Sequence, residues 1–133
     1  HRVPSVVAES GLTENGWVKV DPGNLMTPFP DVYAAGDVVA LPMAKAGVFA
    51  ENAAGVVADD IVARLRGETS GRRYEGEGNC YIEFGSGRVA QVQANFLGGP
   101  SPRAEVVGPS EALTAEKATF APTRRARWFG SEG

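Results

Sequence analysis

Three features of this sequence could take part in chemistry. Gly36-Asp37 follows an apolar run; the glycine lets a ligand approach the backbone closely, and the Asp37 carboxylate can accept a hydrogen bond from a hydroxyl. Lys45 precedes a helical pattern, where free N–H groups and the helix dipole stabilise negative charge. Cys80 is the single cysteine. No CxxC, HExxH, P-loop or serine-triad spacing occurs and His1 has no ligand partners, so we expect no metal site.

The segment that must position Gly36-Asp37 is short and apolar. Residues 31–37 predict a strand, and its continuous apolar character indicates burial on both faces, as in a parallel sheet. A shorter strand is predicted at residues 17–20, between turns at 13–16 and 21–24.

A helix is predicted from Ala46 to Arg66. Apolar residues recur every four positions, at Phe49, Ala53, Val57, Ile61 and Leu65. Arg64 and Arg66 suit the negative end of this helix, and Gly67 ends it.

The second half of the chain predicts a β-hairpin and then a helix. Residues 79–84 and 88–96 are β-rich and flank Gly85-Ser86-Gly87. Alternation places Cys80 on one face with Ile82 and Phe84, which predicts an inward-facing side.

After Pro100 and Pro102, which end the hairpin, a short helix is predicted from Ser110 to Phe120. Ser110 is its expected N-cap and Pro122 is expected to interrupt it. Two interpretations of the tail, Arg124 to Phe129, stay open: a basic face docked on the body by its aromatic residues, or a membrane-surface anchor.

Composition limits the class of protein. The chain has 133 residues and a net charge of −3, which argues against a nucleic-acid binder, and no apolar run is long enough to span a membrane.

With one cysteine no intramolecular disulfide can form, so we expect a cytoplasmic protein, with a membrane-peripheral location as an option. Residues 1–75 hold seven basic and ten acidic residues and residues 76–133 hold six of each, so we predict domains at 1–70 and 71–133 joined by a polar linker.

Thr27 followed by Pro30-Asp31-Val32-Tyr33-Ala34-Ala35-Gly36-Asp37 resembles the second flavin-binding motif of the FAD-dependent pyridine nucleotide-disulfide oxidoreductases. The resemblance implies FAD as cofactor, with Asp37 on the ribityl chain. It also implies that the helix after Lys45-Ala46-Gly47 points its N-terminus at the flavin. The cofactor-binding residues it implies are Gly36, Asp37, Lys45, Ala46 and Gly47.

The lead-in to this helix is similar to that of sulfide:quinone oxidoreductases and flavocytochrome c sulfide dehydrogenases, although Pro42 lies three residues before Lys45 rather than next to it. This similarity implies catalytic roles for Lys45, near flavin or quinone, and for Cys80, as a redox cysteine whose partner lies in an earlier domain. The alternatives are a solvated lysine and a small core cysteine.

The resemblance implies an α+β chain: the end of an FAD-binding α/β domain, then a C-terminal interface domain with a hairpin and a short helix. The GxGxxG motif that holds the FAD pyrophosphate has no match, so we expect these 133 residues alone to be inactive. The implied function is two-electron transfer through flavin; the alternative is a non-catalytic dimerisation or binding module. Expected partners are a second copy, N-terminal FAD- and NAD-binding domains of the same protein, and a quinone or membrane surface.

Overall fold

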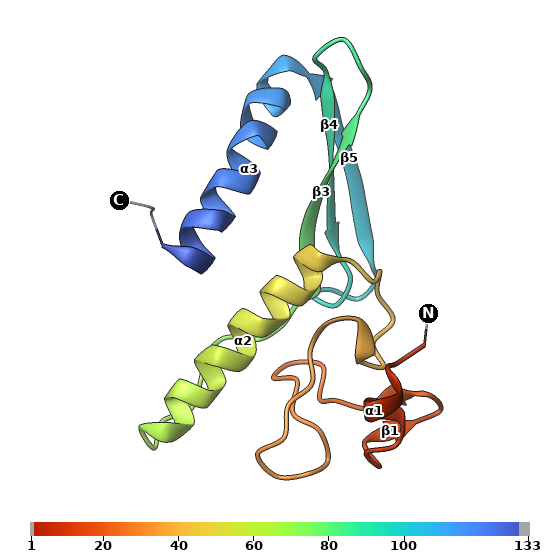
Figure 1. The fold of residues 1–133 in the computed structure, drawn as a ribbon, viewed down its shortest axis with the longest axis vertical. Coiled ribbons are helices and arrows are strands. Elements are labelled where there is room, and N and C mark those ends of the chain that lie inside the picture. Colours follow the sequence, from red (N-terminus) through yellow and green to blue (C-terminus); the bar gives the residue numbers. More distant parts are fainter. Residues whose placement is uncertain (1, 131–133) are drawn as a thin grey trace. The chain divides into compact units, whose positions relative to one another are not determined.

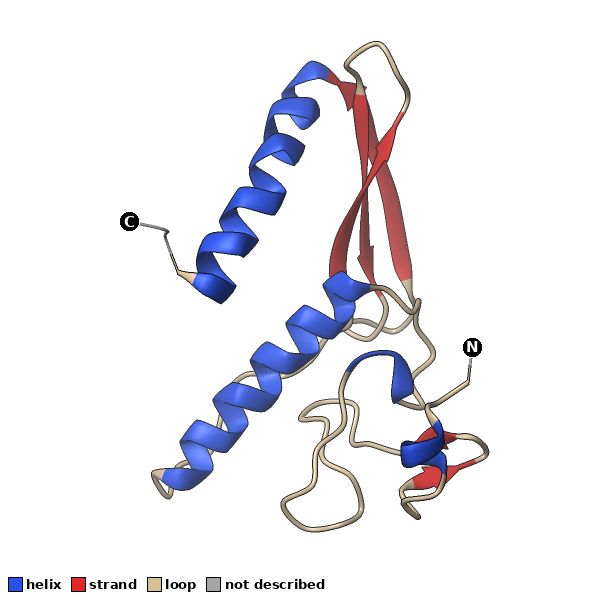
Figure 2. Cartoon of the chain, in the orientation of Figure 1, coloured by secondary structure: helices blue, strands red, loops and turns tan. Residues whose placement is uncertain are grey.

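A computed structural model describes residues 2–130, whose helices and strands are drawn in Figures 1 and 2. These residues form two compact units. The first unit runs to Gly78 and includes Ala94–Arg103; the second comprises Asn79–Gln93 and the residues from Ala104 onward. The elements in chain order are α1 (Ser5–Ala8), β1 (Thr13–Glu14), β2 (Trp17–Val18), the 3₁₀ helix η1 (Gly36–Val38), α2 (Gly47–Leu65), β3 (Glu77–Glu83), β4 (Val89–Asn95), β5 (Arg103–Ser110) and α3 (Glu111–Phe129). The α+β class is confirmed for the described residues, while the predicted domain boundary stays a prediction.

The long helix predicted in the first half is confirmed as α2, which begins after Ala46 and ends before Arg66. Its apolar stripe is buried only in part: Phe49 and Ala53 are buried, but Ile61 is exposed and Leu65 is 83% exposed. The C-terminal half of α2 therefore presents apolar side chains that the first unit does not cover.

The core of the first unit joins α2 to segments far away in the sequence. Leu25, Ala53, Val56 and Tyr74 form one buried cluster. The Tyr74 hydroxyl donates to the Phe49 carbonyl at 3.1 Å, and its backbone N–H donates to the Gly23 carbonyl at 2.7 Å. Tyr74 thus ties the segment after α2 back onto the body of this unit.

The prediction of a strand at residues 31–37 is wrong. Only Tyr33 pairs, in an isolated antiparallel bridge to Met26, and Gly36 begins η1. The positive φ angles of Asp31 (62°) and Gly36 (77°) interrupt extended geometry at both ends of the segment. Its backbone hydrogen bonds are instead local, as in the 3.1 Å bond from the Ala34 N–H to the Leu25 carbonyl.

The strand predicted at residues 17–20 is shorter than expected. Only Trp17–Val18 forms β2, which pairs with β1. The turn predicted at residues 13–16 is therefore reduced to the two residues Asn15-Gly16 that connect these strands. Val18 also makes a parallel bridge with Val39, directly after η1. This bridge fixes the exit of η1 against the small sheet.

The predicted hairpin is confirmed as β3 and β4. The Phe84 N–H donates to the Arg88 carbonyl at 3.0 Å across the turn. A third strand, β5, was not predicted, and the sheet order is β3-β4-β5. The Gly108-Pro109 dipeptide within β5 disfavours a strand in the local sequence. The strand forms because β5 pairs with β4, which is a tertiary effect.

The C-terminal helix is longer than predicted. Ser110 is confirmed as N-cap, since its Oγ accepts from the Leu113 N–H at 3.3 Å. The helix continues through Pro122 to Phe129, so the predicted interruption is wrong. Pro122 is exposed, so the carbonyl left without its helical donor can be hydrated. No helix in residues 2–130 is long and apolar enough to cross a membrane.

Candidate functional site

Gly36 and Asp37 lie in a tight turn packed against α2. A Cβ atom on Gly36 would lie 3.3 Å from the Ala50 Cβ, and the positive φ of Gly36 disfavours any other residue. The Val39 N–H donates to the Gly36 carbonyl at 3.3 Å and closes the turn. Asp37 is exposed, so its carboxylate is accessible to a ligand.

Four of the predicted site residues meet at one small pocket in the first unit. Gly36, Asp37, Lys45 and Ala46 all line it. The other lining residues are Val39, Met43, Ala44, Phe49, Ala50, Ala53 and Tyr74. Gly47, the first residue of α2, is not among them. These four residues lie together although the strand expected to position them does not form, and their role as cofactor-binding residues stays a prediction.

The N-terminus of α2 begins at this pocket. Ala46 is extended (φ −149°, ψ 153°) and offers no side-chain cap. The first amide groups of a helix have no intrahelical partner and carry the positive end of its dipole. Together with the accessible Asp37, the pocket edge thus offers both a hydrogen-bond acceptor and a stabiliser of negative charge.

The Lys45 ammonium group is held by the protein. Its Nζ donates to the Val39 carbonyl at 2.6 Å and lies 4.9 Å from the centroid of the Trp17 ring. Burial lowers the pKa of Lys45, and the charge of Asp37 partly opposes this. Lys45 therefore connects the start of α2 to the end of η1 and to β2. Its catalytic role stays a prediction, and the contribution of Trp17 was missed.

Cys80 lies in β3, in the second unit. It is an exposed free thiol, and its face-mates Ile82 and Phe84 are 44% and 58% exposed. The shared face is thus solvent-accessible in the described residues, and the prediction of an inward face is wrong. Tyr81 lies on the opposite face of β3 and packs against α3, where its ring makes an edge contact with Phe120.

The face that packs against α3 carries a polar network. Gln91 is buried, and its Nε2 donates to Glu116 Oε1 at 2.7 Å, the same oxygen that accepts from the Tyr81 hydroxyl at 2.5 Å. Burial raises the pKa of Tyr81, and the hydrogen bond to Glu116 acts in the same direction. This network attaches α3 to β3 and β4 without involving Cys80.

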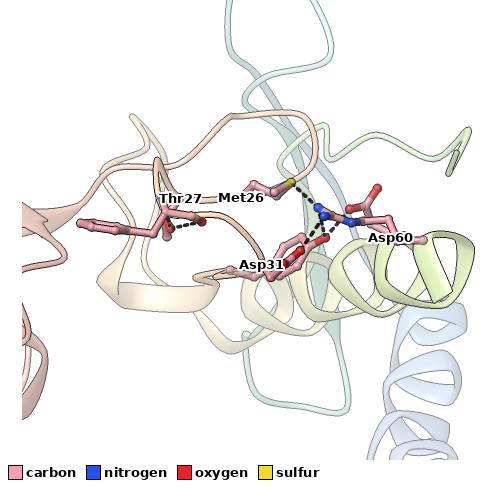
Figure 3. Close-up of polar contacts among 7 residues, drawn as sticks. Met26, Thr27, Asp31 and Asp60 are labelled. Atoms are coloured by element: carbon pink, nitrogen blue, oxygen red, sulfur yellow. Dashed lines mark hydrogen bonds and ion pairs between the residues drawn. The ribbon is translucent and has the colours of Figure 1, made fainter. Parts of the chain in front are cut away.

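A second polar network, in the first unit, was also missed by sequence reasoning (Figure 3). Arg64 Nη2 lies 2.5 Å from Asp31 Oδ1, and the Tyr33 hydroxyl donates to Asp60 Oδ2 at 2.5 Å. The sequence analysis gave Arg64 only a role at the negative end of the helix. The spacing of Asp60 and Arg64, one helical turn apart, is the signal that could have indicated a shared partner.

Comparison with known proteins supports the resemblance seen in the flavin-binding motif. No protein-family model matches the chain. Over its full length the chain is 28% identical to the mitochondrial sulfide:quinone oxidoreductase of Schizosaccharomyces pombe, of which it covers 34%. The chain thus spans about a third of the length of this curated relative.

A solved structure shares the fold. A chain in the cryo-EM structure of the Tetrahymena thermophila mitochondrial ATP synthase matches with a TM-score of 0.62. It is 20% identical, and the match covers 98% of this chain and 30% of that one, a likeness of fold alone. From sequence, the chain is a distant relative of sulfide:quinone oxidoreductase along its whole length.

Proposed function

We propose that this chain is the C-terminal part of an FAD-dependent oxidoreductase of the sulfide:quinone type, which transfers two electrons through flavin. The observation that carries the proposal is the pocket at which Gly36, Asp37, Lys45 and Ala46 meet the start of α2. The distant full-length similarity to a sulfide:quinone oxidoreductase supports it.

The chemistry of the residues at the edge of the pocket supports a flavin as the ligand. Gly36 lets the turn pack closely on Ala50 of α2, and the accessible Asp37 carboxylate can accept a hydrogen bond from a ribityl hydroxyl. The uncapped start of α2 would stabilise negative charge on the cofactor. When bound, FAD would supply the two-electron chemistry. Lys45 would fix the approach of α2 to η1 through the Val39 carbonyl.

The roles beyond this pocket are also proposals. Cys80 would serve as an accessible thiol for sulfur chemistry, paired with a cysteine outside this chain. The rest of the FAD site, including a pyrophosphate loop, would come from N-terminal domains of the same protein, because the chain contains no GxGxxG. The single cysteine led us to expect a cytoplasmic location. The relative is described as a mitochondrial protein, so it does not support that expectation.

The test uses the full-length protein that carries this chain. Asp37→Ala should weaken FAD binding about 10- to 100-fold, since a charge-assisted hydrogen bond contributes about 1.5–3 kcal/mol. Glu9→Gln, which also removes an exposed carboxylate charge in the first unit, is the control and should leave the FAD dissociation constant unchanged.

Two results decide between the candidate functions. Flavin absorbance in the purified protein, together with sulfide-dependent quinone reduction, would support the oxidoreductase. A full-length protein that folds but neither binds FAD nor reduces quinone would contradict it and favour the non-catalytic binding module.

A further inference from the structure

The loop that leads into Gly36-Asp37 is closed on itself before it reaches the turn. The Thr27 N–H donates to the Val32 carbonyl at 2.8 Å, and Met26 and Tyr33 form a bridge. At the loop tip, the Phe29 N–H donates to the Thr27 hydroxyl at 3.2 Å. These bonds join the two sides of the loop, so the contacts of the loop with α2 bear on the direction of the segment that follows.

Four side chains make that attachment, and we call them the Arg64 clamp: Asp31, Tyr33, Asp60 and Arg64 (Figure 3). Arg64 reaches Asp31 with one guanidinium nitrogen, while the other lies 3.4 Å from the Tyr33 hydroxyl and 3.1 Å from the sulfur of Met26. The Tyr33 hydroxyl donates in turn to Asp60. Arg64 therefore contacts both sides of the closed loop, at Met26 on one side and at Asp31 and Tyr33 on the other.

An exposed ion pair by itself contributes little to stability. The clamp therefore depends on the hydrogen bonds of Tyr33 as well as on the Arg64–Asp31 pair. Arg64 and Asp31 are both exposed, but Tyr33 is half-buried and bonds to two groups on α2. Burial, followed by the bond to Asp60, raises the pKa of Tyr33, so the hydroxyl keeps its proton and remains a donor.

The segment between Tyr33 and Gly36 is fixed to α2 at both ends. Gly36 packs on Ala50 near the start of the helix, and Tyr33 bonds to Asp60 near its end. Ala50 and Asp60 are separated by about 15 Å of helix. Three extended residues span only about 10 Å, so the tyrosine side chain must supply the remaining reach. Within this segment, Ala35 is extended (φ −141°, ψ 161°).

We propose that Arg64 and Tyr33 are positioning residues for Asp37: the Arg64 clamp fixes residues 33–35 against α2 and so sets the place of the Gly36-Asp37 turn. The consequence for FAD rests on the proposed function. The effect on the turn itself does not, and each can be measured separately.

The first measurement needs no flavin. In the full-length protein, Arg64→Gln and Tyr33→Phe should each speed hydrogen exchange at the Ala34 and Val39 amides at least tenfold. The Ala34 amide donates to the Leu25 carbonyl and the Val39 amide to the Gly36 carbonyl, so both report on the segment and the turn. Arg72→Gln is the matched control, because it breaks the ion pair between Arg72 and Asp59 of α2 (2.8 Å) without touching the loop, and it should leave both amides unchanged.

The second measurement is FAD affinity in the same variants. The dissociation constant should rise about tenfold in Arg64→Gln and Tyr33→Phe, recover in part in Arg64→Lys, and stay at the wild-type value in Arg72→Gln. Unchanged exchange in both clamp variants would overturn the proposal, as would faster exchange with unchanged FAD affinity. If the wild-type protein binds no FAD, the proposed function fails, and the exchange measurement alone decides whether the clamp holds the turn.

Discussion

Cys80 is accessible, and this changes what its substitution should do. A surface substitution alters the free energy of unfolding by less than about 0.5 kcal/mol. We therefore expect Cys80→Ser to be nearly neutral for stability, and the native thiol to react with a maleimide as fast as a cysteine placed at exposed Ser86 in a Cys80→Ser background. If Cys80 relays sulfur, Cys80→Ser in the full-length protein should also lose sulfide-dependent flavin reduction by orders of magnitude while FAD stays bound.

Two results would contradict these expectations for Cys80. A thiol that reacts much more slowly than the Ser86→Cys reference would mean that another part of the protein covers it. Near-normal sulfide oxidation in Cys80→Ser would exclude the relay role.

Tyr74 should make stability depend on pH in the alkaline range. Burial raises the pKa of its hydroxyl to about 12, whereas in the unfolded chain it titrates near pH 10. The folded state binds this proton more tightly, so the stabilisation is complete below about pH 10 and is lost as the pH rises through about 12. We expect urea unfolding to show a loss of about 2 kcal/mol over this range.

Tyr74→Phe is the control for this pH dependence. It removes the hydroxyl that bonds to the Phe49 carbonyl, so it should be less stable at neutral pH and lose less stability above pH 10. An equal alkaline loss in both proteins would assign the effect to other groups.

At the scale of elements, α3 carries a proline that costs stability. A proline inside a helix is about 3 kcal/mol less favourable than alanine. Since Pro122 lies within α3 and is exposed, Pro122→Ala should stabilise the protein by about 1–3 kcal/mol and raise helical ellipticity at 222 nm.

A second variant tests whether α3 continues past the proline. Ala126→Gly should cost about 1 kcal/mol if residue 126 is helical, as in this structure. No cost at Ala126, together with no gain from Pro122→Ala, would mean that the helix ends at the proline.

At the scale of the molecule, the exposed apolar side chains predict self-association of the 133-residue chain. Ile61, Val62 and Leu65 are exposed together at the end of α2, where the helical stripe continues beyond the core. Light scattering at high protein concentration should give a mass above 13.9 kDa. Leu65→Lys should shift the population toward monomer, while Val6→Lys on α1, at a separate position that is 73% exposed, should not. A monomer at all concentrations would contradict the prediction.

Short-range patterns determined the elements that the sequence alone could predict. The four-residue spacing from Phe49 to Leu65 determined α2, and the glycine turn at 85–87 determined the β3–β4 hairpin. Ser110 determined where α3 begins. The flavin-binding motif likewise placed Gly36, Asp37, Lys45 and Ala46 near one another, because those residues are close in the sequence.

Tertiary structure decided the features that depend on distant partners. β5 exists because β4 offers backbone groups to pair with, despite Gly108-Pro109. Residues 31–37 form a tethered loop because Asp60 and Arg64 lie within reach of Tyr33 and Asp31, a meeting of side chains about thirty positions apart. Alternation along β3 could group Cys80 with Ile82 and Phe84, but it could not say which face would be covered. That depends on where α3 packs, and α3 packs on the face of Tyr81.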